Sequence, residues 1–191
     1  MANTVPYKQI RALYDDETIT VYQAYSAAIA LPAVKEQKLS ASPDFLFGRM
    51  TWIKPSWCWM MYRSGYSYKD DRQSHILALK LKHSHFQHIL SLSSFDTSKP
   101  VRVQWDPERT HKIGSLPYRS IQIGIPRELS QKLVEEWIVG IEDVTHVARG
   151  LKEVVDGEEK VGRDELMKRG LLPMERVYEV EEGIRKVLGM D

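Results

Sequence analysis

The chain has a single cysteine, Cys58, so an internal disulfide and a metal site built on several thiolates are both excluded. No apolar run approaches the roughly 20 residues that a membrane-spanning helix requires. The first residues, Met-Ala-Asn-Thr-Val-Pro, lack the basic and apolar regions of a secretion signal. We therefore expect a soluble, intracellular, cytoplasmic protein without a membrane partner, in which Cys58 is a small buried apolar residue.

Several common catalytic motifs are absent as well. The sequence contains neither of the glycine-rich phosphate loops, G-x-G-x-x-G and G-x-x-x-x-G-K-[ST], and neither H-E-x-x-H nor G-x-S-x-G. Standard dinucleotide-binding, P-loop, zinc-protease and α/β-hydrolase chemistry is therefore disfavoured. The histidines His83, His85 and His88 lie close in sequence, but no carboxylate nearby has a suitable spacing. We predict no metal site.

What the chain does have is an ordinary globular composition with an uneven distribution of charge. Of its 191 residues, 42% are hydrophobic and 28% are charged, which is enough to form a core. Residues 1–125 carry 16 Lys and Arg against 10 Asp and Glu, whereas residues 126–191 carry 11 against 16. The basic part also holds four of the five tryptophans, which suits a phosphate-bearing ligand or a nucleic acid. The alternative is an acidic tail beside a mildly basic body.

Strand-like and helix-like segments are mixed along the chain without regular β-α alternation. Alternating or β-branched patterns predict strands over residues 18–25, 50–53, 75–83, 101–105 and 119–125. Helical spacing predicts helices over residues 27–38 (interrupted by Pro32), 55–64, 126–144 and 163–168, and residues 106–117 are expected to form a loop. We therefore predict an α+β fold: a mixed or antiparallel sheet with flanking helices in residues 1–146, and a helical, charged C-terminal extension, residues 147–191, packed on it.

The segment from Arg49 to Ser64 combines aromatic, cationic and hydroxyl side chains. A pocket that stacks a flat ring and holds a phosphate needs this mixture, because arginine offers a bidentate fork and a helix start offers free N–H groups. An alternative is a core helix whose tryptophans only pack. The candidate ligand-binding residues here are Arg49, Thr51, Trp52, Lys54, Ser56, Tyr62 and Arg63.

The segment Val103 to Arg109 places polar groups where a strand is expected to meet a loop. A carboxylate at this position could orient a ribose hydroxyl or stabilise a developing cation, so Gln104, Asp106 and Glu108 are the candidate catalytic residues. Arg109, and Arg119 and Gln122 on the next strand, are candidates to face the same pocket. The alternative is a capped turn at Asp106-Pro107.

Five segments resemble one uncharacterised family known only by a domain-of-unknown-function label, number 4291. They are residues 10–25, 49–65, 103–109, 119–124 and 171–178. The resemblance covers nearly the whole chain and implies no established activity.

A further resemblance is to the ADP-ribosyltransferase superfamily. The strand Thr20–Tyr25 followed by a helix is similar to the opening of these domains, and residues 50–62 are similar to their second strand and helix. The resemblance implies that NAD is bound by an Arg or His on the first strand, a Ser, Thr or Tyr on the second element and a Glu later in the sequence. The matching positions are Gln23 or Tyr22, then Thr51 with Tyr62, then Gln104, Asp106 or Glu108; Gln23 departs from the Arg or His of the superfamily.

Together these observations predict a protein that binds a nucleotide or a nucleic acid and resembles an ADP-ribosyltransferase in architecture. If it is an enzyme, it transfers or removes an ADP-ribose group, with NAD as the cofactor. The alternative is a non-enzymatic RNA- or DNA-binding module using the same surface. A protein partner for the acidic tail is a third possibility.

Overall fold

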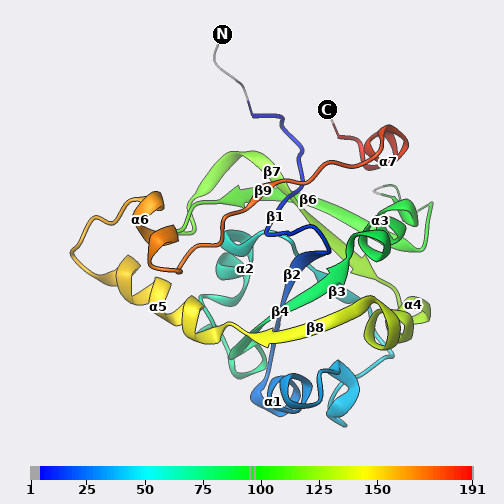
Figure 1. The fold of residues 1–191 in the computed structure, drawn as a ribbon, viewed down its shortest axis with the longest axis horizontal. Coiled ribbons are helices and arrows are strands. Elements are labelled where there is room, and N and C mark those ends of the chain that lie inside the picture. Colours follow the sequence, from blue (N-terminus) through cyan, green and yellow to red (C-terminus); the bar gives the residue numbers. More distant parts are fainter. Residues whose placement is uncertain (1–4, 95, 97, 191) are drawn as a thin grey trace.

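A computed structural model describes residues 5–94, 96 and 98–190, and its strands form two main sheets (Figure 1). An antiparallel three-stranded sheet has the order β2 (Thr18–Tyr25), β4 (His75–Lys82), β8 (Ile138–Asp143). A four-stranded sheet has the order β3 (Thr51–Ile53), β7 (Ser115–Ile125), β6 (Val101–Arg109), β5 (Ser93–Ser94), with β5 and β6 parallel. A short antiparallel pair joins β1 (Arg11–Ala12) to β9 (Arg176–Val177).

The two main sheets meet where β2 passes the end of β3. The amide N–H of Tyr22 donates to the carbonyl of Lys54 at 2.7 Å, and the N–H of Lys54 donates back to Tyr22 at 3.3 Å. This one bridge holds the residue that follows β3 beside the middle of β2.

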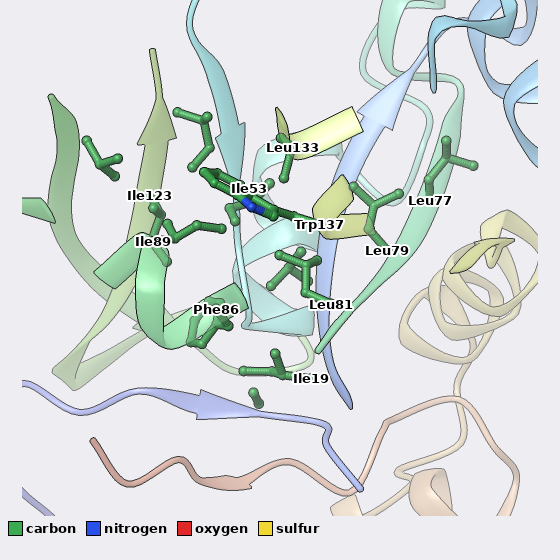
Figure 2. Close-up of a cluster of buried hydrophobic side chains, with 14 of the residues drawn as sticks. Ile19, Ile53, Leu77, Leu79, Leu81, Phe86, Ile89, Ile123, Leu133 and Trp137 are labelled. Carbon is green, nitrogen blue, oxygen red and sulfur yellow. The ribbon is translucent and has the colours of Figure 1, made fainter. Parts of the chain in front are cut away.

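The larger core lies between the two sheets. Alternation along each strand sends one set of side chains inward, so Ile19, Leu77, Leu79 and Leu81 of one sheet face Ile53 and Ile123 of the other (Figure 2). Phe86 and Ile89 of α3 (His83–Ser91) and Trp137 fill the space between them. Nearly all of these side chains are fully buried, which removes their apolar surface from water and stabilises the packing of the two sheets.

A second core covers the opposite face of the sheet β2-β4-β8. Tyr22 and Ala78 of that face pack against Trp57 and Met61 of α2 (Trp57–Ser64) and Leu151 of α5 (Thr145–Asp156). The sheet is therefore apolar on both faces, and α2 is held between it and the four-stranded sheet (Figure 1).

The remaining helices are α1 (Ala27–Glu36), α4 (Arg127–Lys132), α6 (Arg163–Lys168) and α7 (Glu182–Leu188). Short 3₁₀ turns occur at Leu39–Ala41 and Asp71–Gln73. The α1 helix runs through Pro32 without a break, so the predicted interruption at Pro32 is wrong.

Two further sequence predictions of local structure are wrong. The helix expected over residues 126–144 ends in a wide turn at Leu133–Trp137, and residues 138–143 form β8 instead. The open edge of β4 pairs with this β-branched stretch, which outweighs its helical spacing. The loop expected after Asp106 is also wrong, because β6 continues to Arg109 and the sheet accommodates Pro107 at an irregularity in the register with β7.

The predicted α+β class is confirmed, with antiparallel and mixed sheets and seven α-helices in the part of the chain that the structure describes. Within those residues, none of the helices is long and apolar enough to cross a bilayer. The segment 147–191 packs closely on the rest of the chain: Leu151, Leu166 and Leu172 enter the second core, and Tyr178 and Leu188 enter the first.

Candidate functional site

The connection from β3 to α2 carries the densest group of candidate residues. Lys54 and Pro55 leave the strand, and Ser56 caps the helix because its Oγ accepts from the N–H of Trp59 at 3.1 Å. Gly65 ends the helix with φ of 57°, a left-handed conformation that glycine adopts without strain. The helix end predicted at Ser64 is confirmed, whereas the helix begins at Trp57, so that Pro55 precedes the cap and does not form part of the first turn.

A pocket of about 340 Å³ opens beside this connection, between the end of β2, α1, the segment preceding β3, and α2. Its wall carries the cationic side chains Arg49, Lys54, Arg63 and Arg72, and no Asp or Glu is among the described residues that line it. Lys54 is buried, whereas the three arginines are exposed at the surface. We call this the cationic pocket. Its other lining residues are Gln23, Ala24, Tyr25, Ile29, Phe45, Leu46, Met50, Thr51, Trp52, Met60 and Gln73.

A hydrogen-bonded chain fixes one wall of the cationic pocket. The hydroxyl of Tyr25 donates to Oε1 of Gln23 at 2.7 Å, and Nε2 of Gln23 donates to the carbonyl of Trp52 at 2.8 Å. The ring of Trp52 lies against β7 at Gly124, where an added Cβ would come within 3.0 Å of the indole. Gly124 thus leaves room for the tryptophan that lines the pocket.

Lys54 is the most unusual group in the pocket. Only 7% of the residue is exposed, and its Nζ donates to the carbonyl of Trp52 at 3.3 Å and lies 5.5 Å from the centroid of the Trp59 ring. The pKa of the amine is lowered to about 7, mainly by burial and to a smaller extent by the nearby Arg63, while Asp106 opposes the shift. Since the ammonium has no ion pair with a carboxylate among the described residues, a bound anion would be its natural counter-charge.

Two carboxylates, of the buried Glu108 and the partly buried Glu175, converge on the start of α2. Glu108 Oε1 accepts from Ser56 Oγ and from the N–H of Arg109, both at 2.7 Å, and Glu175 Oε1 accepts from the N–H of Trp57 at 2.6 Å. Burial is the main cause that raises the pKa of Glu175 to about 8, and the charge of Glu108 adds to it. Burial also raises the pKa of Glu108, against the hydrogen bonds that favour its charged form.

The other two candidate catalytic residues lie on the outer face of β6. Asp106 accepts a short hydrogen bond from Nε2 of Gln122 on β7, and its charge acts on Lys54. Gln104 stands opposite Gln122 in the register of the two strands and is exposed.

The structure thus divides the sequence-predicted residues into groups. The cationic pocket collects Gln23, Arg49, Thr51, Trp52, Lys54 and Arg63. Ser56 and Glu108 meet at the helix start, and Asp106 pairs with Gln122. Arg109 lies outside the pocket with its guanidinium 3.6 Å from the ring centroid of the exposed Tyr62.

Two candidates lie away from the pocket altogether. The side chain of Tyr22 packs under α2, with its ring 5.1 Å from that of Trp57, because it points to the opposite face of β2 from Gln23. Arg119 lies over Tyr7, and its Nε donates to the Tyr7 hydroxyl at 2.8 Å.

Sequence reasoning missed Arg72, Gln73 and Glu175. Arg72 and Gln73 belong to a polar stretch whose sequence is typical of an ordinary loop. In the structure Nε2 of Gln73 donates a hydrogen bond to Asp70, and Oε1 of Gln73 accepts one from Arg63. Glu175 lies in a segment that resembles the same uncharacterised family, and that was the one available signal.

No group of three or more His, Cys, Asp or Glu side chains that could hold a metal ion occurs among residues 5–94, 96 and 98–190. The first histidine of the sequence cluster, His83, instead contacts the Tyr178 hydroxyl at 3.0 Å and the Asp15 carbonyl at 2.8 Å. Cys58 is buried, and burial raises the pKa of its thiol, which disfavours the reactive thiolate.

Comparison with known proteins gives one result that covers most of the chain. A family model described as "Domain of unknown function (DUF4291)" matches residues 9–178, a range that contains all five segments on which the sequence resemblance was based. No curated protein matches the chain.

Proposed function

The chain belongs to the family described as domain of unknown function DUF4291, and from the geometry of its cationic pocket we propose that it binds the phosphate groups of a nucleotide. The observation that carries this proposal is the buried Lys54 in a wall with three arginines and no carboxylate. Burying an ammonium without a counter-charge costs folding free energy, so its retention there favours a role with an anionic ligand.

The apolar residues that line the pocket support a ligand with an apolar or aromatic part. Ile29, Phe45, Leu46 and Met50 contribute apolar surface, and Trp52 offers the edge or face of an indole. A volume of about 340 Å³ is at the lower end of the range for small-molecule sites, so a nucleotide would place one phosphate-bearing part inside and the remainder outside.

The finer proposal is an ADP-ribosyltransferase-like enzyme that uses NAD. Arg49, Lys54 and Arg63 would hold the pyrophosphate, and a carboxylate on β6 would stabilise the ribosyl cation as the bond to nicotinamide breaks. Asp106, whose charge already acts on Lys54, is the candidate on the outer face of the sheet, and the buried Glu108 is the other.

The second candidate is a non-enzymatic nucleic-acid-binding module. The observation that favours it is the position of the Arg109 guanidinium 3.6 Å from the ring centroid of the exposed Tyr62, which lies on the same helix, α2, as Arg63 of the cationic pocket. Such arginine–aromatic pairs can stack on unpaired bases while a phosphate enters a basic pocket.

Titration of the purified protein with NAD, ADP-ribose and inorganic phosphate, followed by tryptophan fluorescence, tests the proposal because Trp52 lines the pocket. We expect saturable binding, weakened by roughly 10- to 100-fold in R63M, since one charge-assisted hydrogen bond to phosphate is lost. The matched control is R119M, which removes a partly exposed arginine outside the pocket and should bind like the wild type.

The same experiment discriminates between the two functions. A single-stranded RNA oligonucleotide that binds more tightly than NAD, with affinity falling steeply as salt rises, would favour the nucleic-acid module. Absence of binding to every phosphate compound, or equal losses in R63M and R119M, would contradict the proposal.

A further inference from the structure

Lys54 differs from the other lysines of the chain in its surroundings. Lys38, Lys152 and Lys186 form surface ion pairs with Glu135, Asp156 and Glu182. Lys54 is 7% exposed, lines a pocket, and has a backbone carbonyl as the only hydrogen-bond acceptor of its Nζ among the described residues. Its amine can therefore lose its proton without breaking an ion pair.

The surroundings of Lys54 act on its charge in both directions. Burial and the positive charge of Arg63 favour the neutral amine, whereas Asp106, the carbonyl of Trp52 and the face of the Trp59 ring favour the ammonium, and burial is the largest of these effects. A lysine in an apolar site beside another cation is the setting in which the amine acts as a nucleophile toward carbonyl carbon. The pKa of about 7 is consistent with this setting, because a large fraction of the amine is then unprotonated near neutral pH.

We propose that the Lys54 amine condenses with the aldehyde of a phosphate-bearing compound bound in the cationic pocket and forms an imine. This inference rests on the proposed function, since the arginines that would hold a nucleotide phosphate would hold the phosphate of the aldehyde. The open-chain form of a ribose phosphate, as in ADP-ribose, has this chemistry.

The step balances without another reactant. The nitrogen lone pair of Lys54 attacks the carbonyl carbon, and one amine proton moves to the carbonyl oxygen to give a carbinolamine. Its hydroxyl then leaves with the second amine proton as water while the C=N bond forms. Neither carbon nor nitrogen changes its oxidation state, so no oxidant or reductant is required.

Pyridoxal 5′-phosphate is a suitable probe because it joins an aldehyde, a phosphate and an aromatic ring. Pyridoxine 5′-phosphate, which has an alcohol in place of the aldehyde, is the matched non-covalent ligand. The full-length protein is incubated with each at pH 7, treated with borohydride to reduce any imine to a stable amine, digested, and mapped by mass spectrometry.

We expect label on Lys54 at a level at least tenfold above that on any other lysine, and none at position 54 in K54R. K35R, which changes a lysine with 82% of its side chain exposed, should leave the label on Lys54 unchanged. Because wild-type protein is mapped directly, a folding defect in K54R would not prevent the test.

Binding of pyridoxine 5′-phosphate without a label on Lys54 would overturn the inference and leave the proposed function standing. Label spread evenly over the exposed lysines would overturn it as well. Failure of pyridoxine 5′-phosphate and of nucleotides to bind would contradict the proposed function, and the inference with it.

Discussion

Burial of the Lys54 amine lowers the stability of the fold, while the proposed function requires the same amine in the pocket. Its amine is bonded to the carbonyl of Trp52, and Gln23 donates to the same oxygen, so the backbone of β3 does not depend on the lysine. We therefore expect an apolar replacement of Lys54 to increase the stability of the fold, which is the behaviour of many residues that serve binding and not stability.

The first prediction concerns the replacement K54M. Because the pKa of Lys54 is about 7 when folded and near 10.5 when unfolded, the unfolded state binds more protons between these values, and wild-type stability rises with pH across that window. K54M removes this penalty, so its gain over the wild type should be a few kcal/mol at pH 6 and should shrink toward pH 10.

Urea unfolding of both proteins at pH 6 and pH 9 measures this difference. K35M serves as the control, because Lys35 is exposed and should show no pH-dependent gain. A constant difference between K54M and the wild type at the two pH values would show that the amine is not desolvated.

The second prediction concerns Glu175, whose pKa is raised to about 8. A raised carboxyl pKa means that its contribution to stability is fully present below about 4.5 and is lost as pH rises through about 8. E175Q keeps an oxygen for the N–H of Trp57 and cannot ionise, so it should exceed the wild type by on the order of 1–3 kcal/mol at pH 9.

The two proteins should be nearly equal in stability at pH 5, where Glu175 is protonated. E179Q changes an exposed carboxyl and provides the baseline in the same thermal or urea experiments. Greater stability of the wild type over E175Q at pH 9 would refute the assignment.

At the residue scale, the sequence indicated which types of residue form the pocket, but not which side chains point into it. Gln23 and Tyr22 are neighbours, yet they point to opposite faces of β2, and only the register with β3 decides which one meets Trp52. Arg119 appeared equivalent to Gln122 because both lie near the start of one strand. Its pairing with Tyr7, far away in sequence, could not be inferred.

Among the elements, α2 organises both parts of the site. Its N-terminal cap Ser56 is shared, since the hydroxyl accepts from Trp59 and donates to Glu108. Its packed face anchors the helix in the second core, while Met60 and Arg63 reach the cationic pocket.

The third prediction is that S56A destabilises the protein by about 1–2 kcal/mol, because it removes a capping bond and leaves a buried carboxylate oxygen with one partner fewer. Ser26 caps α1 without a side-chain hydrogen bond, so S26A is a matched control that should change stability by less than about 0.5 kcal/mol. Denaturant unfolding at pH 7 measures both, and equal effects would contradict the role assigned to Ser56.

The fourth prediction concerns β7 at Gly124. A Cβ at this position would lie 2.8 Å from Met50 Sδ and 3.0 Å from the Trp52 ring, and both residues line the cationic pocket. G124A should therefore displace Trp52 and weaken nucleotide binding by roughly tenfold or more. In G140A the added Cβ meets nothing closer than 3.6 Å, so binding should be retained; a similar effect of the two substitutions on the titration would count against this pocket wall.

At the element scale, the strands β2, β4, β6 and β7 could be recognised in the sequence because large apolar side chains recur at every second position in each of them. The strand β8 was not recognised, because Leu129, Leu133 and Trp137 set a helical period that Ile141 and Val144 continue. Residues 138–143 form a strand because they pair with the edge of β4, and this long-range pairing cannot be read from the local period of the sequence.

In the molecule as a whole, the acidic C-terminal segment completes the fold of the basic part. Its strand β9 pairs with β1 (Figure 1). Tyr178 and Leu188 enter the larger core, and Glu175 accepts from the N–H of Trp57 at the start of α2. Among the residues that the structure describes, no Asp or Glu of the acidic segment lines the cationic pocket.

The central claim is that Lys54 and its neighbouring arginines receive an anionic ligand, and proton uptake on binding measures it most directly. Calorimetric titration with NAD at pH 8, in two buffers of different ionisation enthalpy, reports the number of protons bound with the ligand. A pKa of about 7 leaves the free amine mostly neutral at this pH. NAD has no aldehyde for the amine to attack, so its phosphate charge should restore the proton, and we predict uptake approaching one proton in the wild type and none in K54R. Binding without proton uptake, or with the same uptake in both proteins, would contradict the account.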